Sequence, residues 1–216
     1  MSIDVSKAVE SIGLVPVVVI DDAADAVPAA LALKAGGVPV MEITLRTAAG
    51  LDAIEAVAKD APDVLVGAGT VLTLEKAMEA YERGAQYIVS PGFDPKIVSW
   101  CVENDVSIFP GCVTPTEITA AIGMSLKVVK FFPANIYGGI KAIKALAGPF
   151  PDIRFMPTGG VDLSNLKDYV IPEVIAVGGG WLCARKDIKE KQFGKITEIC
   201  SESVNVVKQC KETSSQ

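Results

Sequence analysis

Residues 86–110 have the sequence QYIVSPGFDPKIVSWCVENDVSIFP, and they contain one full copy of the pattern that decides the fold. An apolar, β-branched run covers 86–90, an amphipathic stretch covers 95–104, and a second apolar run covers 107–110. Asp94 and Pro95 stand where a helix would start, at positions that favour these two residue types. The pattern predicts strand, helix and strand in that order, which is the βαβ unit of a parallel sheet.

The same alternation continues in both directions along the chain. Further helix starts are indicated by Thr73 and Thr114. The predicted strands are 14–20, 38–44, 64–67, 86–90, 107–110, 128–132, 153–157 and 174–177. The predicted helices are 23–35, 48–59, 74–83, 95–104, 115–122, 140–146, a weaker one at 163–169, and 193–209, followed by a frayed tail at 211–216.

Continuous apolar runs that alternate with helices indicate a parallel sheet covered on both faces. Eight strands in this order predict an α/β fold, a closed (β/α)8 TIM barrel that occupies residues 1–216 as a single domain. An amphipathic N-terminal segment, residues 1–13, predicts a short helix that leads into the barrel. An open, doubly wound sheet is the alternative architecture.

Composition restricts the partners and the chemistry. The net charge is −6 and no basic run occurs, so we expect no nucleic-acid partner. The longest apolar stretch, 14–20, is too short to span a membrane, and residues 1–13 lack the apolar centre of a secretory signal. The five cysteines form no CxxC pair and are expected to be free thiols of a cytoplasmic protein.

The chain contains no histidine, which narrows the possible reactions. A serine–histidine–acid triad and histidine-ligated metals are excluded, and we expect neither a metal nor a cofactor. Proton transfer near neutral pH must therefore use a carboxylate, a lysine, a tyrosine, a thiol or water.

Active sites of (β/α)8 barrels lie where the strands end and in the loops that follow. Polar residues and glycines at those positions are the candidates for a site. They are Glu42, Thr44, Arg46, Thr70, Pro91, Thr114, Lys130, Asn135, Thr158, Gly159, Gly160 and the run Gly178–Gly180.

Lys130 stands in the apolar run Val-Val-Lys-Phe-Phe over residues 128–132, with no other charge nearby in the sequence. Alternation along a strand places Val128, Lys130 and Phe132 on one face. Burial there favours the neutral amine, the form that a Schiff-base nucleophile needs. The structural alternative is a lysine that reaches out from a strand end or pairs with a core carboxylate.

Glu42 is a single charge within another strand, Val40-Met-Glu-Ile-Thr44. A carboxylate inside a barrel is costly unless it is paired, hydrogen-bonded or protonated. General acid/base catalysis is the functional interpretation. A structural ion pair with Lys130 or Arg46 is the alternative.

Glycine-rich turns follow the last two predicted strands, Thr158-Gly-Gly160 and Gly178-Gly-Gly180. Barrels of this class frequently bind a phosphate at these two places, through backbone N–H groups. Simple tight turns are the alternative. A third turn, Gly67-Ala-Gly-Thr70, lacks the spacing of a dinucleotide site or a P-loop, and Pro91 shapes the end of the fourth strand.

These residues together resemble the 2-dehydro-3-deoxy-phosphogluconate (KDPG) aldolase / 4-hydroxy-2-oxoglutarate (KHG) aldolase family. The segments that carry the resemblance occur in the family's order and spacing. They are Met41-Glu-Ile-Thr-Leu-Arg46, Val66-Gly-Ala-Gly-Thr70, Val89-Ser-Pro-Gly92, Pro110-Gly111, Lys130-Phe-Phe-Pro-Ala134, Gly148-Pro-Phe150 and Pro157-Thr-Gly-Gly160.

The resemblance implies a homotrimeric class I aldolase of the Entner–Doudoroff pathway that needs no metal. It implies reversible cleavage of 2-dehydro-3-deoxy-6-phosphogluconate to pyruvate and glyceraldehyde 3-phosphate, with 4-hydroxy-2-oxoglutarate as a second candidate substrate. Lys130 matches the Schiff-base lysine and Glu42 the acid/base carboxylate. Arg46, Thr70, Pro91, Phe132 and Thr158 match substrate-contact positions, and Gly159, Gly160, Gly179 and Gly180 match phosphate-loop positions.

The chain departs from the family pattern at three positions, none of them in the lysine–glutamate pair. Gly180 replaces a serine that many members carry, which removes one hydroxyl donor to a phosphate. Val19 replaces an arginine of some members, and Asn135 replaces a glutamate. The alternatives to the sugar-phosphate aldolase are a Schiff-base oxaloacetate decarboxylase and a non-catalytic barrel that binds a phosphate ligand.

Overall fold

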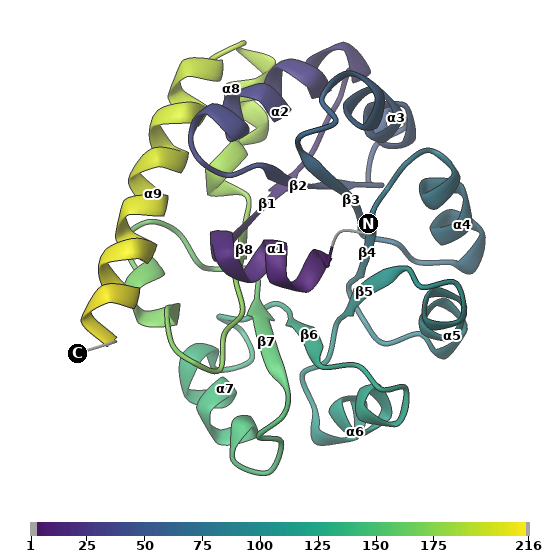
Figure 1. Ribbon diagram of the computed structural model, residues 1–216, viewed down its shortest axis with the longest axis vertical. Helices are drawn as coiled ribbons and strands as arrows, with labels where there is room; N and C mark the ends of the chain where they lie inside the picture. Colours follow the sequence, from purple (N-terminus) through teal and green to yellow (C-terminus); the bar gives the residue numbers. More distant parts are fainter. Residues whose placement is uncertain (1–3, 215–216) are drawn as a thin grey trace.

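The computed structural model describes residues 4–214 of the chain. Eight strands lie inside a surrounding layer of helices, and α1 crosses the strands near the centre of the view in Figure 1. The strands are β1 (Leu14–Val18), β2 (Val40–Thr44), β3 (Leu65–Gly69), β4 (Tyr87–Ser90), β5 (Ser107–Pro110), β6 (Val128–Phe131), β7 (Arg154–Pro157) and β8 (Val177–Gly179).

All the strand pairs are parallel. Six strands form one sheet in the order β5-β4-β3-β2-β1-β8, and β6 pairs with β7 in a second sheet. Isolated bridges connect the two sheets, Gly111 with Lys130 beside β5 and Thr158 with Gly178 beside β7. The predicted α/β fold with eight parallel strands is therefore confirmed.

Most predicted helices are present within a few residues of their expected bounds. The side chains of Thr73, Asp94 and Thr114 accept hydrogen bonds from the first turns of their helices, as predicted, and Glu117 completes a capping box with Thr114. The helical segments are α1 (Val5–Ile12), η1 (Ala23–Asp25), α2 (Ala26–Ala35), α3 (Gly50–Asp60), α4 (Leu74–Glu82), α5 (Pro95–Glu103), α6 (Pro115–Gly123), α7 (Gly139–Ala147), η2 (Leu166–Tyr169), η3 (Trp181–Cys183), α8 (Arg185–Lys189) and α9 (Phe193–Ser214).

Two predictions about the C-terminal quarter were wrong. The eighth strand was expected at 174–177, but β8 starts at Val177 and continues through Gly178 and Gly179, which pair with β1. Glycine is needed at 179 because a Cβ there would lie 1.6 Å from the Trp181 ring. Backbone pairing and this close packing determine β8, so a prediction from apolar side chains placed it too early.

The expected frayed tail at 211–216 was also wrong for its described part. Helix α9 continues to Ser214, and the Lys211 ammonium donates to the carbonyl of Glu10 in α1 at 2.9 Å. The weaker predicted helix at 163–169 is reduced to the short segment η2. None of the helices within residues 4–214 is both long and apolar enough to cross a membrane.

Helix α1 and Arg154 mark one end of the strands. Val5 and Val9 of α1 are buried, and Gly13 turns the chain directly into β1. Arg154, the first residue of β7, makes an ion pair with Glu10 of α1 at 3.2 Å. The N-terminal ends of the strands are therefore covered, and the candidate residues lie toward the opposite ends.

Candidate active site

Lys130 and Glu42 meet in the interior, although 88 residues separate them in the sequence. The Lys130 ammonium (Nζ) lies 3.3 Å from Oε1 of Glu42, and the two side chains are only 7% and 1% exposed. They come from β6 and β2, two strands that do not pair with each other. The Nζ atom also lies 5.4 Å from the centre of the Phe132 ring. The two isolated charges of the sequence therefore form one buried ion pair.

Gly69 of β3 creates the space for the Glu42 carboxyl group. Gly67 is the register partner of Glu42, and Gly69 is the partner of Thr44. A Cβ at Gly69 would lie 2.2 Å from Oε1 of Glu42, so the carboxyl group lies directly over that glycine. The expected third strand, 64–67, was therefore too short at its C-terminal end. The glycines that we assigned to a turn belong to the strand and make room for a side chain.

Three further predicted residues follow the strands at this end. Thr70 comes directly after β3 and has a φ of 58°, a backbone conformation that is unusual for a β-branched residue. Pro91 follows β4 and is half-buried. Its carbonyl group lies close to Gly111, because a Cβ added to Gly111 would be only 2.0 Å from the Pro91 carbonyl oxygen. Arg46 follows β2 and is exposed. It forms no salt bridge among the described residues, so the alternative of a Glu42–Arg46 ion pair is not what the structure contains.

The loops after β6, β7 and β8 interlock. Thr158 is buried after β7, and its carbonyl accepts a hydrogen bond from the N–H of Ala134 at 2.8 Å. Gly159 and Gly160 have φ values of 93° and 73°, which favour glycine. A Cβ at Gly160 would lie 2.2 Å from Cγ of Asn135. Asn135 thus packs against the glycine loop that we expected to bind phosphate.

The glycines of the last loop have different roles in the structure. A Cβ at Gly178 would lie 2.2 Å from Oγ1 of Thr158, which keeps the two loops in contact. Gly179 is required by Trp181, as described above. Gly180 has ordinary backbone angles, and the nearest atom to a Cβ there is the carbonyl oxygen of Val17 at 3.6 Å. Packing explains the first two glycines, whereas Gly180 leaves space for a side chain.

Sequence reasoning missed one residue of this interior, Tyr87 of β4. The Tyr87 hydroxyl, Oγ1 of Thr44 and Oε2 of Glu42 are buried without a hydrogen-bond partner in the described part of the chain. Burial raises the pKa of Tyr87 well above its usual value, and the nearby Glu42 charge raises it further. The signal in the sequence was a tyrosine in an apolar strand next to a strand that contains glycines.

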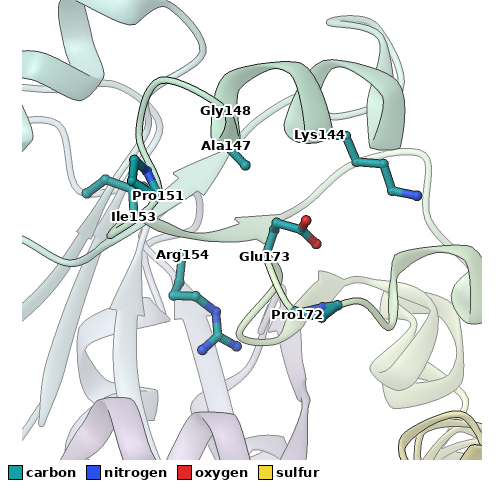
Figure 2. Close-up of a pocket in the computed structure, with 8 residues that line it drawn as sticks. All are labelled: Lys144, Ala147, Gly148, Pro151, Ile153, Arg154, Pro172 and Glu173. Carbon is teal, nitrogen blue, oxygen red and sulfur yellow. The ribbon is translucent and has the colours of Figure 1, made fainter. Parts of the chain in front are cut away.

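The other polar features lie away from this site. A surface hollow of about 400 Å³ lies at the start of β7 and not at its end. Its lining includes Lys144, Glu173 and Arg154, whose side chains are drawn in Figure 2. Across residues 4–214, no group of three or more histidine, cysteine, aspartate or glutamate side chains is arranged to hold a metal ion.

The predicted free thiols are present at four buried positions, Cys101, Cys112, Cys183 and Cys200. Burial raises the pKa of Cys101, Cys112 and Cys200 to about 12. These thiols therefore stay protonated near neutral pH. Protonated thiols are poor nucleophiles.

Comparison with known proteins agrees with this geometry. Residues 5–199 match the family model for KDPG and KHG aldolase. The chain is 43% identical to 2-dehydro-3-deoxy-phosphogluconate aldolase of Treponema pallidum over 95% of this chain and 98% of the relative. It is 42% identical to KHG/KDPG aldolase of Escherichia coli K12 over 90% and 92% of the two chains.

A solved structure is similarly close. The crystal structure of KDPG aldolase from Legionella pneumophila, with pyruvate captured at low pH as a covalent carbinolamine intermediate, superposes with a TM-score of 0.89. The sequence identity is 36%, and the alignment covers 93% of this chain and 98% of the other.

Proposed function

The chain belongs to the KDPG and KHG aldolase family, and from this we propose that its buried Lys130–Glu42 pair performs a class I aldolase reaction. The substrate is 2-dehydro-3-deoxy-6-phosphogluconate, which is cleaved reversibly to pyruvate and glyceraldehyde 3-phosphate. The observation that carries the proposal is the 3.3 Å contact between an ammonium and a carboxylate in an interior with little access to solvent.

The reaction uses one proton acceptor and one nucleophile. Glu42 takes a proton from the Lys130 ammonium, and the neutral amine attacks the C2 carbonyl of the 2-oxo acid. Glu42 returns that proton to the carbinolamine oxygen, which leaves as water, and the resulting iminium accepts the electron pair of the C3–C4 bond. Glu42, deprotonated again, takes the C4 hydroxyl proton as that bond breaks and the aldehyde leaves. Glu42 then returns this proton to C3 of the enamine, and hydrolysis of the resulting iminium releases pyruvate and restores Lys130.

The surrounding residues are assigned by their positions at the strand ends. Arg46 and Thr70 are proposed to contact the pyruvate carboxylate, and Pro91 and Phe132 to form walls of the pocket. Thr158 is proposed to contact the substrate where the phosphate loop begins. The proposed phosphate contacts are Gly159, Gly160, Gly179 and Gly180, of which Gly159 and Gly160 gain support from their left-handed backbone conformation.

Borohydride trapping with pyruvate tests the covalent step. Reduction of the iminium should add one pyruvate-derived mass irreversibly, and peptide mapping should locate it on Lys130. The same protein without pyruvate is the control and should gain no mass. A wild-type protein that remains unlabelled would contradict the proposed mechanism.

The preference for a phosphorylated substrate is tested by comparing kcat/KM for 2-dehydro-3-deoxy-6-phosphogluconate and 4-hydroxy-2-oxoglutarate. We expect the phosphorylated substrate to be preferred. If kcat/KM is no higher for the phosphorylated substrate, the assignment of a sugar-phosphate substrate is wrong. That result would not contradict the Schiff-base mechanism.

Gly180→Ser is expected to raise kcat/KM for the phosphorylated substrate by about tenfold. A serine fits because the nearest atom of the described chain to a Cβ at this position, apart from the adjacent residues, is the Val17 carbonyl oxygen at 3.6 Å. A hydrogen bond to a charged group contributes about 1.5–3 kcal/mol, which corresponds to about tenfold or more. Steady-state kinetics with both substrates gives the measurement.

Gly180→Ala is the matched control, because it adds the Cβ without the hydroxyl and should leave the substrate preference unchanged. Equal effects of alanine and serine, or an equal gain for the unphosphorylated substrate, would contradict a phosphate contact at residue 180.

We further propose that the two sheets form one closed eight-stranded (β/α)8 barrel. The parallel bridges Gly111–Lys130 and Thr158–Gly178 support closure at both junctions. A homotrimer is proposed from the family resemblance, and light scattering would measure its mass. The buried free thiols support a reducing compartment, which we propose to be the cytoplasm.

A further inference from the structure

Tyr87 of β4 has no role in the mechanism described so far, yet its side chain lies in the barrel interior. The residue is 0% exposed, and its ring packs against Phe109 at a centroid distance of 5.9 Å. Its hydroxyl has no hydrogen-bond partner among residues 4–214. Because the pKa of Tyr87 is raised by burial and by Glu42, the hydroxyl keeps its proton and remains a hydrogen-bond donor.

The ring of Tyr87 points across β3 toward β2. A Cβ at Gly67 would lie 2.4 Å from Cζ of Tyr87, so the hydroxyl-bearing end of the ring lies over that glycine. Gly67 is the register partner of Glu42 in the next strand. The hydroxyl, one bond beyond Cζ, therefore extends from β4 over β3 in the direction of Glu42.

Glu42 has an acceptor available to this donor. Its Oε1 atom accepts from Lys130, whereas Oε2 is buried and has no partner in the described chain. The hydroxyl of Thr44, on the same face of β2, is also buried without a partner. Buried polar groups are normally hydrogen-bonded, and one internal water can satisfy three such groups at once.

We propose that Tyr87 is a positioning residue for Glu42, acting by donating through one buried water to Oε2 of the carboxylate. This contact holds Oε1 of Glu42 toward Lys130. The inference rests on the proposed aldolase mechanism and deepens it. The titratable groups that the described structure places beside Glu42 are Lys130 from β6 and Tyr87 from β4, while Thr44 contributes a neutral hydroxyl.

Tyr87→Phe is expected to move the acid limb of the kcat/KM profile for retro-aldol cleavage upward by about one pH unit, the size expected for one hydrogen bond to a charged group. The direction follows because loss of a donor to the carboxylate favours its protonated form. As the pH is lowered, the carboxylate is therefore protonated at a higher pH than in the wild type. At pH values above the acid limb, kcat/KM should stay within about threefold of the wild-type value. An acid limb that stays in place or moves down overturns the inference.

Two further variants keep the result interpretable. Thr44→Val removes the other buried hydroxyl that we assign to this water, so it should shift the acid limb in the same direction. This second variant tests the inference if the Tyr87→Phe protein fails to fold. Tyr169→Phe removes a hydroxyl from a tyrosine of η2 that is 7% exposed, and its limb should not move. An equal shift in Tyr169→Phe overturns the inference.

Thermal unfolding and borohydride labelling complete the experiment. A hydroxyl that is merely buried without a partner would raise Tm when removed and leave the pH profile unchanged, which overturns the proposal. Failure of the wild type to label with pyruvate removes the aldolase mechanism itself. If the wild type is labelled normally but the acid limb of Tyr87→Phe does not move, only the proposed role of Tyr87 is contradicted.

Discussion

Lys130→Ala is expected to abolish pyruvate–borohydride labelling and to lower kcat for cleavage by at least about a thousandfold, because no covalent intermediate can form without the amine. Cys112, whose N–H donates to the Lys130 carbonyl, does not replace the amine, since burial raises the pKa of its thiol to about 12 and keeps it protonated. Electrospray mass spectrometry after trapping gives the label count, and steady-state cleavage gives the rate.

Stability has to be separated from chemistry in this variant. Removing Lys130 leaves Glu42, with its side chain 1% exposed, without its ion-pair partner, and a buried unpaired carboxylate costs free energy unless it binds a proton. Unfolding curves should therefore show a lower Tm at pH 8 than at pH 5, relative to wild type. Lys130→Met keeps the apolar length of the side chain and should be equally inactive.

Lys127→Ala is the matched control, since Lys127 precedes β6 and is exposed. It should label and cleave as wild type does. If Lys130→Met still acquires the pyruvate mass, or if Lys127→Ala loses it, the nucleophile is not Lys130.

The order of strands and the two interior charges were predictable because both depend on local pattern. A charge in an apolar strand is conspicuous in any sequence, and Lys130 and Glu42 were identified in that way. Their contact was not predictable from residues alone. It depends on β2 and β6 facing each other across the interior, and on Gly69 leaving room for the carboxylate.

The features that were missed depend on close packing between residues far apart in the sequence. Gly179 belongs to β8 because of Trp181, and α9 extends past residue 210 where Lys211 binds α1. Tyr87 was unremarkable in the sequence because tyrosine is common in strands. The position of its ring over Gly67 and the effect of the Glu42 charge on its pKa connect it with Glu42 in the folded structure.

Glu42→Gln is expected to lower kcat for cleavage by about 10²–10⁴-fold while Lys130 still becomes labelled by pyruvate and borohydride. The amide keeps the volume of the side chain over Gly69 but cannot accept the C4 hydroxyl proton. Lys130 loses a neighbouring negative charge, which favours its neutral amine, so the Schiff base still forms. Labelling without cleavage would assign Glu42 to proton transfer and Lys130 to the covalent bond.

Exchange of the pyruvate methyl protons with D2O, followed by NMR, isolates the proton transfer at C3. It requires the iminium and a base but no aldehyde, so Glu42→Gln should lose exchange and cleavage together. Glu42→Asp is the matched control, because it retains a carboxylate in a side chain that is one methylene shorter. In the wild type the carboxylate lies over Gly69, 3.3 Å from Nζ of Lys130, and the shorter side chain withdraws it from that place. It should recover part of both activities. If Glu42→Gln exchanges protons at the wild-type rate, another group or a water molecule performs the step at C3 and Glu42 serves Lys130 only as a counter-ion.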